Sequence, residues 1–404
     1  MKSNLINSVM LSAACLLTTN GVFAQTPKTN VLGQYNTITT GVPFLRISPD
    51  ATAGAMGDVG IATDPEANAQ FWNVAKLSMA SKNEGASMTY TPWLKDLVGD
   101  IALYYLTAYK KFGENNNQAV SGSLRYFNLG DINYIDVNQV ANGTGKPREY
   151  ALDAGYSRKL SDKLSLGVTG RYIHSNLATG SAATTGYKAG NAFAVDAGIY
   201  YTKNFASKND DISGNKFNFG AVISNLGTKI SYSDTRKDFL PTNLGVGAAY
   251  IYKIDEFNTF TVALDLNKLL VPSPQFDSLG NQYYPTNESV INGLFKSFGD
   301  APGGGKEELQ EINGSLGVEY GYQNQFFARA GYFYEDKYKG DRKYATVGLG
   351  FKYTSFGLNF SYLVPSGSGL TRNPLSNTLR FSLTFDFDKI AAKKKQAADA
   401  NTEE

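Results

Sequence analysis

The sequence has 404 residues, a formal net charge of +2 at pH 7, and many glycines and aromatic residues: 41 Gly, 26 Tyr and 24 Phe. So balanced a charge gives no indication of a nucleic-acid partner or of an acidic substrate. The mean hydropathy is −0.28. After the first 24 residues, no run of about 18 apolar residues exists that could form a membrane-spanning helix.

The N-terminus has the features of a secretory signal peptide. Lys2 gives a positive start, an apolar run extends from Val9 to Leu17, and Val22-Phe23-Ala24 offers a cleavage site. We therefore expect residues 1–24 to be removed. Cys15 lies inside the apolar run and lacks the small residues that precede the cysteine of a lipoprotein signal. The mature chain would then hold no cysteine, which excludes disulfides and thiol chemistry.

Residues 25–84 form a segment of different character. Gly, Ala and Asp are frequent, Pro43, Pro49 and Pro65 interrupt the segment, and sustained alternation of apolar and polar residues is missing. We expect this segment to fold inward as a plug, or to line the periplasmic mouth of the structure that follows. A disordered leader is the alternative, because chain termini are often loose.

From residue 85 to residue 388, apolar and polar residues alternate with period two in about fourteen runs, which is typical of β-strands. In the last run, apolar and polar positions alternate from Leu379 to Phe387, with Phe381 and Leu383 on one face and Arg380 and Ser382 on the other. Other clear runs lie near residues 99–112, 117–127, 148–160, 163–175, 190–205, 215–225, 240–253, 260–267, 312–320 and 345–353.

Strand length and loop length favour a membrane barrel over a soluble sandwich. The runs have about 10 to 13 residues, as a tilted span of a bilayer needs, whereas soluble strands average about 5 or 6. Short connections such as Ser161-Asp162 alternate with long ones, except for a connection of about 9 residues after Phe205. We therefore expect an all-β transmembrane antiparallel barrel of about 14 strands over residues 85–388, with an N-terminal plug-like segment. The loop 271–311 would be external and the polar tail 389–404 periplasmic.

Charged residues within the expected spans fall on the face opposite the apolar set. They are Asp153, Arg171, Asp196, Asp265, Glu319, Arg329, Lys352 and Arg380. A basic side chain that faces lipid at the bilayer midplane costs roughly 2–4 kcal/mol. We therefore expect all of them to face the lumen.

This assignment places Leu383 and Arg380 on opposite faces of the last strand. We expect Leu383→Arg to impair barrel assembly far more than Arg380→Leu, because only the first variant puts a charge into lipid. The fraction of folded barrel, measured by heat-modifiable mobility on gels, checks this prediction. Equal damage by the two variants would contradict the assignment of faces.

The long loop over residues 271–311 has an apolar pattern of its own. Asn287 can cap a short helix in which apolar residues recur near helical spacing. They are the candidate partner-binding residues Val290, Ile291, Leu294, Phe295 and Phe298. Two interpretations stay open: the apolar stripe packs on the barrel rim, or it docks on another protein, as large exposed apolar patches usually do.

The sequence carries no pattern of a catalytic or cofactor site. Nucleophile-elbow, zinc-protease and phosphate-loop motifs are missing. The run Gly303-Gly304-Gly305-Lys306 lacks the preceding strand and the following Ser or Thr of a phosphate loop. The single histidine, His174, has no Cys or carboxylate at ligand spacing. We expect no enzyme activity, no cofactor and no bound metal.

Four blocks of the sequence carry a family resemblance. They are GAMGDVGIATDPEANAQFWNVAKL (Gly54–Leu77), SFGDAPGGGKEELQEIN (Ser297–Asn313), RAGYFYEDKYKGDRKY (Arg329–Tyr344), and FSYLVP with NPLSNTLRFSL (Phe360–Leu383). In these blocks the chain resembles the PorV (LptO) family, outer-membrane barrels of the type IX secretion system, within a larger group that resembles FadL channels. The second block is specific to PorV-like sequences. Where the family usually has Asn-Pro-Ala-Lys, this chain has Asn73-Val74-Ala75-Lys76.

The resemblance implies a fourteen-stranded barrel of the bacterial outer membrane, surrounded by its lipid and lipopolysaccharide. Proteins of this family associate with the translocon barrel SprA (Sov), receive cargo by its C-terminal signal domain, and pass it to an attachment complex that contains the PorU sortase. The expected function is that of a cargo-binding shuttle. The alternatives are a FadL-type channel for hydrophobic small molecules, which the polar inner face disfavours, and an outer-membrane hydrolase, which lacks a recognisable nucleophile.

Overall fold

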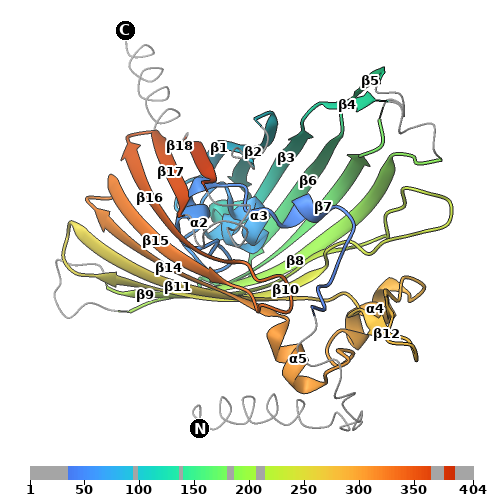
Figure 1. The fold of residues 1–404 in the computed structure, drawn as a ribbon. Helices are drawn as coiled ribbons and strands as arrows, with labels where there is room; N and C mark the ends of the chain where they lie inside the picture. The colour runs from blue at the N-terminus through green and yellow to red at the C-terminus, as the bar shows by residue number, and fades with distance from the viewer. Residues whose placement is uncertain are drawn as a thin grey trace.

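The computed structural model describes residues 35–93, 99–135, 140–179, 186–205, 214–364 and 377–386. The signal peptide expected at residues 1–24 and the tail expected at residues 389–404 lie outside the described residues. Within these ranges, fourteen antiparallel strands form one closed barrel, because the first strand pairs with both its successor and the last strand (Figure 1). The expected fold class is confirmed. No helix in the described part of the chain is long and apolar enough to cross a membrane.

The barrel strands follow one another around the wall in chain order. They are β1 (Glu84–Pro92), β2 (Ile101–Phe112), β3 (Gln118–Leu129), β6 (Arg148–Lys159), β7 (Leu164–Asn176), β8 (Gly190–Asn204), β9 (Lys216–Gly227), β10 (Asn243–Lys253), β11 (Asn258–Leu269), β14 (Ile312–Tyr322), β15 (Phe326–Tyr334), β16 (Lys343–Tyr353), β17 (Phe356–Val364) and β18 (Leu379–Asp386). Their lengths, from 8 residues in β18 to 15 in β8, suit tilted strands that cross a bilayer.

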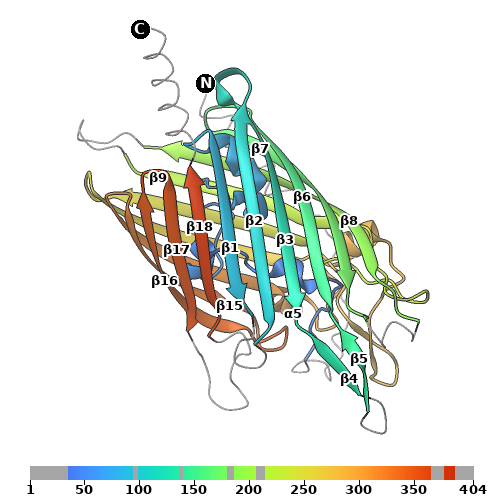
Figure 2. The ribbon, with the colours of Figure 1, turned by 90° about the horizontal axis from the view of Figure 1, so that it is seen from above.

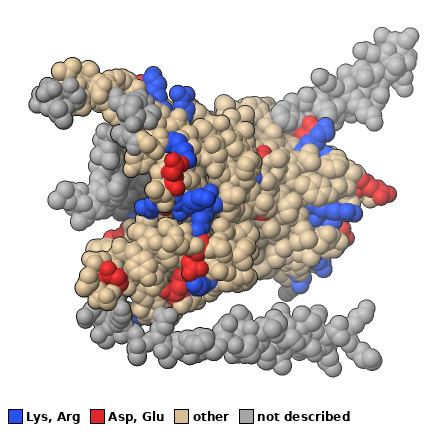
Figure 3. Space-filling model, turned by 90° about the vertical axis from the view of Figure 1, so that its right-hand side faces the viewer, with Lys and Arg blue, Asp and Glu red and all other residues tan. Residues whose placement is uncertain are grey.

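Side chains alternate between an exposed outer face and a buried inner face of the wall. On β16, for example, Val347 and Leu349 are 45% and 64% exposed, whereas Thr346, directly before Val347, is 1% exposed. The outer residues are mostly apolar. On the face drawn in Figure 3, Lys, Arg, Asp and Glu gather toward the two ends, and few lie in the broad zone between them. This distribution is typical of a barrel with a lipid-facing belt.

The two ends of the barrel differ in the length of their connections. At one end most connections are short, such as the two residues between β16 and β17, and a 3-10 helix, η3 (Glu114–Asn116), lies in another. The exception is the connection of eleven residues between β8 and β9. At the opposite end the connections are long. Here β4 (Ile132–Ile135) and β5 (Ala141–Gly145) form a hairpin that extends past the wall (Figure 2). We call the two ends the short-turn end and the long-loop end.

Residues 35–83 form an inner segment that the strands surround in Figure 1. Its helices are η1 (Pro43–Arg46), α2 (Ala51–Ala55), α3 (Ala69–Trp72) and η2 (Val74–Met79). The segment starts at the long-loop end, where the N–H of Asn36 donates to the carbonyl of Tyr338 at 2.9 Å. It ends at the short-turn end, where the carbonyl of Asn83 accepts from the N–H of Lys111 at 2.7 Å. A barrel of this size encloses space that wall side chains alone do not fill, and the inner segment occupies part of it.

Polar side chains of the inner wall satisfy the irregular backbone of this segment. Asp265 accepts hydrogen bonds from the N–H groups of Gly60 and Ile61 at 2.7 and 2.9 Å. The hydroxyl of Thr346 accepts one from the N–H of Gly57 at 2.8 Å. Irregular backbone is tolerated at membrane depth only where protein groups or water satisfy it. The polar inner face is therefore required by the packing of the inner segment.

Two wall glycines leave room for the inner segment. A Cβ atom at Gly167 would lie 2.5 Å from the backbone N of Ala75, and one at Gly331 would lie 2.0 Å from the carbonyl carbon of Met56. Both distances are far below van der Waals contact, and these two neighbours are backbone atoms that cannot rotate away. Backbone of the inner segment therefore lies directly against backbone of the wall at these points.

The structure adds a cost for replacing Arg380 that the sequence did not reveal. Its side chain is buried, its Nε donates to the carbonyl of Ser48 at 3.2 Å, and its Nη2 lies 3.7 Å from Asp58 Oδ1. Arg380→Leu would therefore loosen the inner segment. Leu383 contributes to the outer surface. We now expect a smaller difference between Leu383→Arg and Arg380→Leu than the sequence alone predicts.

Candidate functional site at the long-loop end

Three of the charged residues singled out in the spans meet on the neighbouring strands β6, β7 and β8. Arg171 donates through Nε and Nη2 to the two carboxylate oxygens of Asp153, at 2.7 and 3.0 Å. It also reaches both oxygens of Asp196, at 3.1 and 2.9 Å. These side chains are 1–6% exposed. Such paired, charge-assisted hydrogen bonds fix the relative positions of the three strands.

Asn225 joins this cluster because β9 contains a bulge. Ser224 and Asn225 face the single residue Asp196 of β8, and Asn225 has a φ of +58°. Its N–H donates to Asp196 at 2.7 Å, and its amide oxygen accepts from Arg171. A bulge re-aims side chains in this way. The result is a buried polar cluster that links four strands.

The other five charged residues of the spans do not join this cluster. Asp265 and Arg380 bind the inner segment as described above. Arg329 pairs with Glu319 at 2.6 Å and donates to Asn359 at 2.9 Å, and Lys352 pairs with Asp386 at 2.7 Å. The eight residues therefore form separate structural contacts and do not converge on one site.

A cavity of about 100 Å³ lies between the inner segment and the wall. Its lining includes the charged residues Arg46, Asp58, Arg171 and Arg342, the amides Asn225, Asn243, Asn267 and Asn313, and the rings of Phe71, Trp72 and Tyr344. On this measure a single water needs roughly 10–15 Å³. The cavity therefore has room for a few waters, and its walls differ from the mostly apolar, larger pockets that bind drug-sized ligands.

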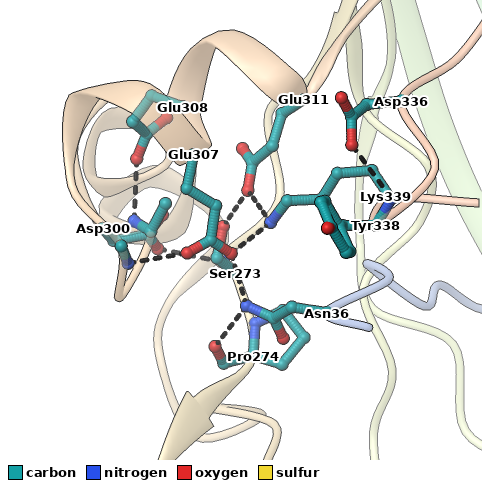
Figure 4. Close-up of polar contacts among 12 residues, drawn as sticks. Asn36, Ser273, Pro274, Asp300, Glu307, Glu308, Glu311, Asp336, Tyr338 and Lys339 are labelled. Carbon is teal, nitrogen blue, oxygen red and sulfur yellow. Dashed lines mark hydrogen bonds and ion pairs between the residues drawn. The ribbon is translucent and has the colours of Figure 1, made fainter. Parts of the chain in front are cut away.

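The long loop between β11 and β14 contains β12 (Gln275–Phe276), β13 (Gln282–Tyr283), α4 (Val290–Lys296) and α5 (Gly305–Gln310). A group of polar residues connects this loop to the β15–β16 loop and to the start of the inner segment (Figure 4). We call this group the loop clamp. It consists of Asn36, Lys268, Glu307, Glu311 and Lys339.

The loop clamp is a compact network of alternating charges. Lys339 Nζ lies 2.5 Å from Glu307 Oε1 and 2.9 Å from Glu311 Oε1. Lys268 Nζ lies 2.6 Å from the other oxygen of Glu311, and the amide of Asn36 donates to Glu307 at 2.7 Å. The side chains of Lys339, Glu307 and Glu311 are 1–8% exposed. The clamp thus ties α5 and the residue after it to three other parts of the chain: β11, the β15–β16 loop and the inner segment.

The clamp depends on the ionised form of Glu307. Burial alone would raise the pKa of this carboxyl. Hydrogen bonds from Lys339 and Asn36 outweigh that effect, so the pKa lies below its usual value. A carboxyl whose pKa falls on folding stabilises the fold above its unfolded-state pKa, and that stabilisation is lost as the pH falls through the folded-state value. We therefore expect an intact clamp at neutral pH and a clamp that weakens only when the pH falls below the ordinary pKa of a glutamate.

Lys339→Met is expected to weaken the attachment of the long loop by roughly 3 kcal/mol, because it leaves two buried carboxylates without this ammonium group. Limited proteolysis of the folded barrel in detergent measures the effect as faster cleavage within residues 276–289. Lys306→Met is the matched control, because Lys306 lies on the exposed side of α5. Equal cleavage rates for Lys339→Met and the wild type would show that the clamp does not hold the loop.

Helix α4 is present, but its start differs from the expectation. The expected cap, Asn287, is wrong: Ser289 is the N-cap residue, and its hydroxyl accepts a hydrogen bond from the N–H of Asn292 at 3.2 Å. Ser and Asn are both favoured at this position, so residue preference alone could not choose between them.

One side of α4 packs on the rim and another side is exposed. A Cβ atom at the buried Gly293 would meet the rings of Pro272 and Phe239 within 3.1 Å, and Val290 and Leu294 are half-buried. The side chains of Ile291, Phe295 and Phe298 are 57%, 71% and 51% exposed. The rim-packing interpretation therefore describes one side of the stripe, and the other side stays exposed. We call Ile291, Phe295 and Phe298 the α4 surface.

Two other features of the sequence have structural explanations. The run Gly303-Gly304-Gly305 leads into α5, and the N–H of Gly303 donates to Glu307 at 2.6 Å. His174 stacks on Tyr150, with ring centroids 5.0 Å apart, and contacts Asn191. Among the described residues, no group of three or more His, Cys, Asp or Glu could hold a metal ion.

A closed barrel of long antiparallel strands, with an apolar outer belt and connections that are long at one end and short at the other, defines the class of outer-membrane β-barrels. The family model described as "Type IX secretion system protein PorV" matches residues 30–276. The chain therefore belongs to the PorV family, and is a bacterial outer-membrane protein of type IX secretion. In such barrels the long loops are external, and we expect the same orientation for the long-loop end of this barrel.

Several solved barrels are similar in structure. They include the toluene transporter TodX of Pseudomonas putida (13% identity, 87% of this chain and 98% of that chain, TM-score 0.46) and the toluene transporter TbuX of Ralstonia pickettii (12%, 83% and 96%, 0.43). A FadL homologue of Pseudomonas aeruginosa is also similar (11%, 87% and 99%, 0.42). No curated protein matches the sequence. At these identities the similarity carries no argument about function.

Proposed function

We propose that this protein is a shuttle of type IX secretion. It binds the C-terminal signal domains of secreted proteins at the translocon and delivers them to the surface attachment complex. The observation that carries the proposal is the α4 surface, in which three large apolar side chains are more than half exposed at the external end. Ile291 and Phe295 lie on α4, and Phe298 follows its end. Exposed apolar residues of this size, grouped together and rimmed by polar residues, usually mark a partner-binding site.

The loop clamp supports this role because it orders the loop before any partner binds. A preordered loop loses less conformational entropy on association, so more of the contact energy appears as affinity. At Gly293, α4 packs closely against Pro272 and Phe239, which leaves the α4 surface on another side for a partner. We propose that this partner is a cargo signal domain or a translocon barrel similar to SprA (Sov), and that a PorU-like sortase complex receives the cargo.

The proposed role involves no covalent chemistry, so we propose a non-enzymatic protein without a cofactor. The alternative is a FadL-type channel for hydrophobic small molecules. It requires an apolar path through the lumen. The inner segment and the small, amide-rich cavity beside it do not favour such a path.

Direct binding tests the proposal. Purified protein in detergent should bind an isolated cargo signal domain, and it should not bind the same cargo without that domain. The alternative is tested on the same preparation by conductance in planar bilayers and by uptake of fatty acids into liposomes. Uptake of hydrophobic solutes together with no binding of the signal domain would contradict the shuttle and support the channel.

A further inference from the structure

The external ends of β1, β2, β3 and β6 present an ordered series of residue types on their outer face. A row of tyrosines crosses the strands, since Tyr104 pairs with Tyr126 and Tyr126 with Tyr150 in the strand register. The ring of Tyr90 continues the row, 5.4 Å from that of Tyr104. Aromatic rows of this kind mark the level of the membrane interface in outer-membrane barrels.

The residues on either side of the tyrosine row differ in polarity. Two residues toward the middle of the barrel, Leu106 pairs with Leu124, and both are exposed on the outer face. Two residues toward the external end, Asn128 pairs with Arg148, and Arg148 is exposed. Lys146 precedes Arg148 and is also exposed. From the middle of the barrel toward its long-loop end, the outer residues are therefore aliphatic, then aromatic, then basic. This order matches a lipid layer, whose acyl chains give way to an interface and then to charged headgroups.

Two adjoining hollows follow this order. The first, of about 530 Å³, is lined by Tyr104, Tyr126, Asn128, Asp131, Lys146 and Arg148. The second, of about 390 Å³, lies nearer the barrel middle and is lined by the same two tyrosines and by apolar residues that include Met88, Leu106, Leu124 and Phe381. Because they share Tyr104 and Tyr126, the hollows form one groove with a basic end and an apolar end.

The charges at the basic end leave a cation available. Lys146 Nζ lies 3.1 Å from Asp131 Oδ2, with both side chains at least half exposed. The N–H of Asp131 donates to the carboxylate of Asp100 at 2.8 Å. Within the described residues, the Arg148 guanidinium forms no ion pair. Arginine binds phosphate through paired hydrogen bonds, so Arg148 can bind one phosphate while Lys146 turns toward the same group.

We propose that this groove binds a phosphorylated, multiply acylated glycolipid of the outer leaflet. Arg148 and Lys146 would bind its phosphate, the tyrosine row would lie at the level of its sugars, and an acyl chain would fill the apolar hollow. The occupant follows from two observations: the groove is continuous with the lipid-facing belt, and its polar end, at the long-loop end of the barrel, carries two basic residues against one carboxylate. The proposal does not depend on the shuttle function.

Native mass spectrometry of the purified full-length mature protein tests this site, with bisphosphorylated hexa-acylated lipid A as the probe. We expect the double variant Arg148→Gln/Lys146→Gln to bind it about 25-fold more weakly, since each basic residue near an anionic lipid surface is worth about fivefold in affinity. Arg158→Gln is the matched control, because Arg158 is exposed on the same face of β6 at its short-turn end. It should bind lipid A as the wild type does. Heat-modifiable mobility confirms that each variant is folded.

Lipid A without its phosphates should bind the wild type as weakly as lipid A binds the double variant. Three results would overturn the proposal. They are unchanged lipid A binding by the double variant, an equal loss in Arg158→Gln, and equal binding of the phosphate-free lipid by the wild type. Lipid-independent binding of a protein partner that is lost in the double variant would assign the groove to that partner instead.

Discussion

Arg171→Leu is expected to lower the free energy of unfolding of the barrel by about 3–5 kcal/mol. The variant leaves Asp153 and Asp196 buried without their shared cation, and these carboxylates lie on neighbouring strands. It also removes a hydrogen-bond partner of Asn225 at the bulge of β9. The measurement is a urea titration of the refolded protein in detergent, with the folded fraction at each concentration read from heat-modifiable mobility.

A compensated variant separates the charge effect from the loss of packing. Arg171→Leu combined with Asp153→Asn and Asp196→Asn removes the uncompensated charges and keeps the shapes of the two acceptors, so it should recover most of the lost stability. Stability in the single variant within about 0.5 kcal/mol of the wild type, which is typical of surface substitutions, would show that the cluster is not buried as the structure has it.

Ile291→Asp combined with Phe295→Asp is expected to weaken binding of the partner at the α4 surface by at least tenfold. Residues that anchor an interface cost about 2 kcal/mol or more when they are removed, and a charge in an apolar contact adds a desolvation cost. Both side chains are more than half exposed in the protein alone, so the fold should be unaffected. Pull-down of cargo and translocon from solubilised outer membrane measures the loss.

Leu279→Asp is the matched control for this experiment. Leu279 is 85% exposed and lies in the same loop, between β12 and β13 and outside α4 in the sequence. It should retain both partners at the wild-type level. If the double variant at Ile291 and Phe295 also retains both partners, the α4 surface has another role and the proposed contact is wrong.

The barrel itself could be predicted from the sequence because lipid and lumen make opposite demands on alternate residues. Leu349 and Thr346 lie three residues apart on one strand, and the first is 64% and the second 1% exposed. A period-two pattern records such a difference directly. The alternation of short and long connections also predicts the direction of each strand, and therefore which strand ends lie at the short-turn end and which at the long-loop end.

The path of the inner segment could not be predicted, because its contacts join distant parts of the chain. Gly60 and Asp265 are 205 residues apart and are linked by one hydrogen bond. The bulge at Asn225 could not be predicted for a similar reason, because its positive φ depends on pairing with the partner strand. Asparagine is not specific to such positions, so its presence does not identify a bulge. Local patterns carry no information about either feature.

The loop clamp leaves a partial signal in the sequence. Glu307 and Glu311 are four residues apart, the spacing that puts two side chains on one face of a helix. Their cation, Lys339, lies in a different loop, so the sequence does not distinguish the pair from ordinary solvated carboxylates. The apolar residues of α4 were recognised as a group, but only the structure shows which of them are exposed.

The central claim is that this protein delivers cargo to the cell surface, and surface proteolysis of intact cells tests it most directly. In a strain that lacks the gene, cargo with a C-terminal signal domain should be absent from the surface and protected from added protease. Wild-type protein should restore surface cargo, and the Ile291→Asp/Phe295→Asp variant should not. Normal amounts of protease-accessible cargo in the deletion strain would contradict the account.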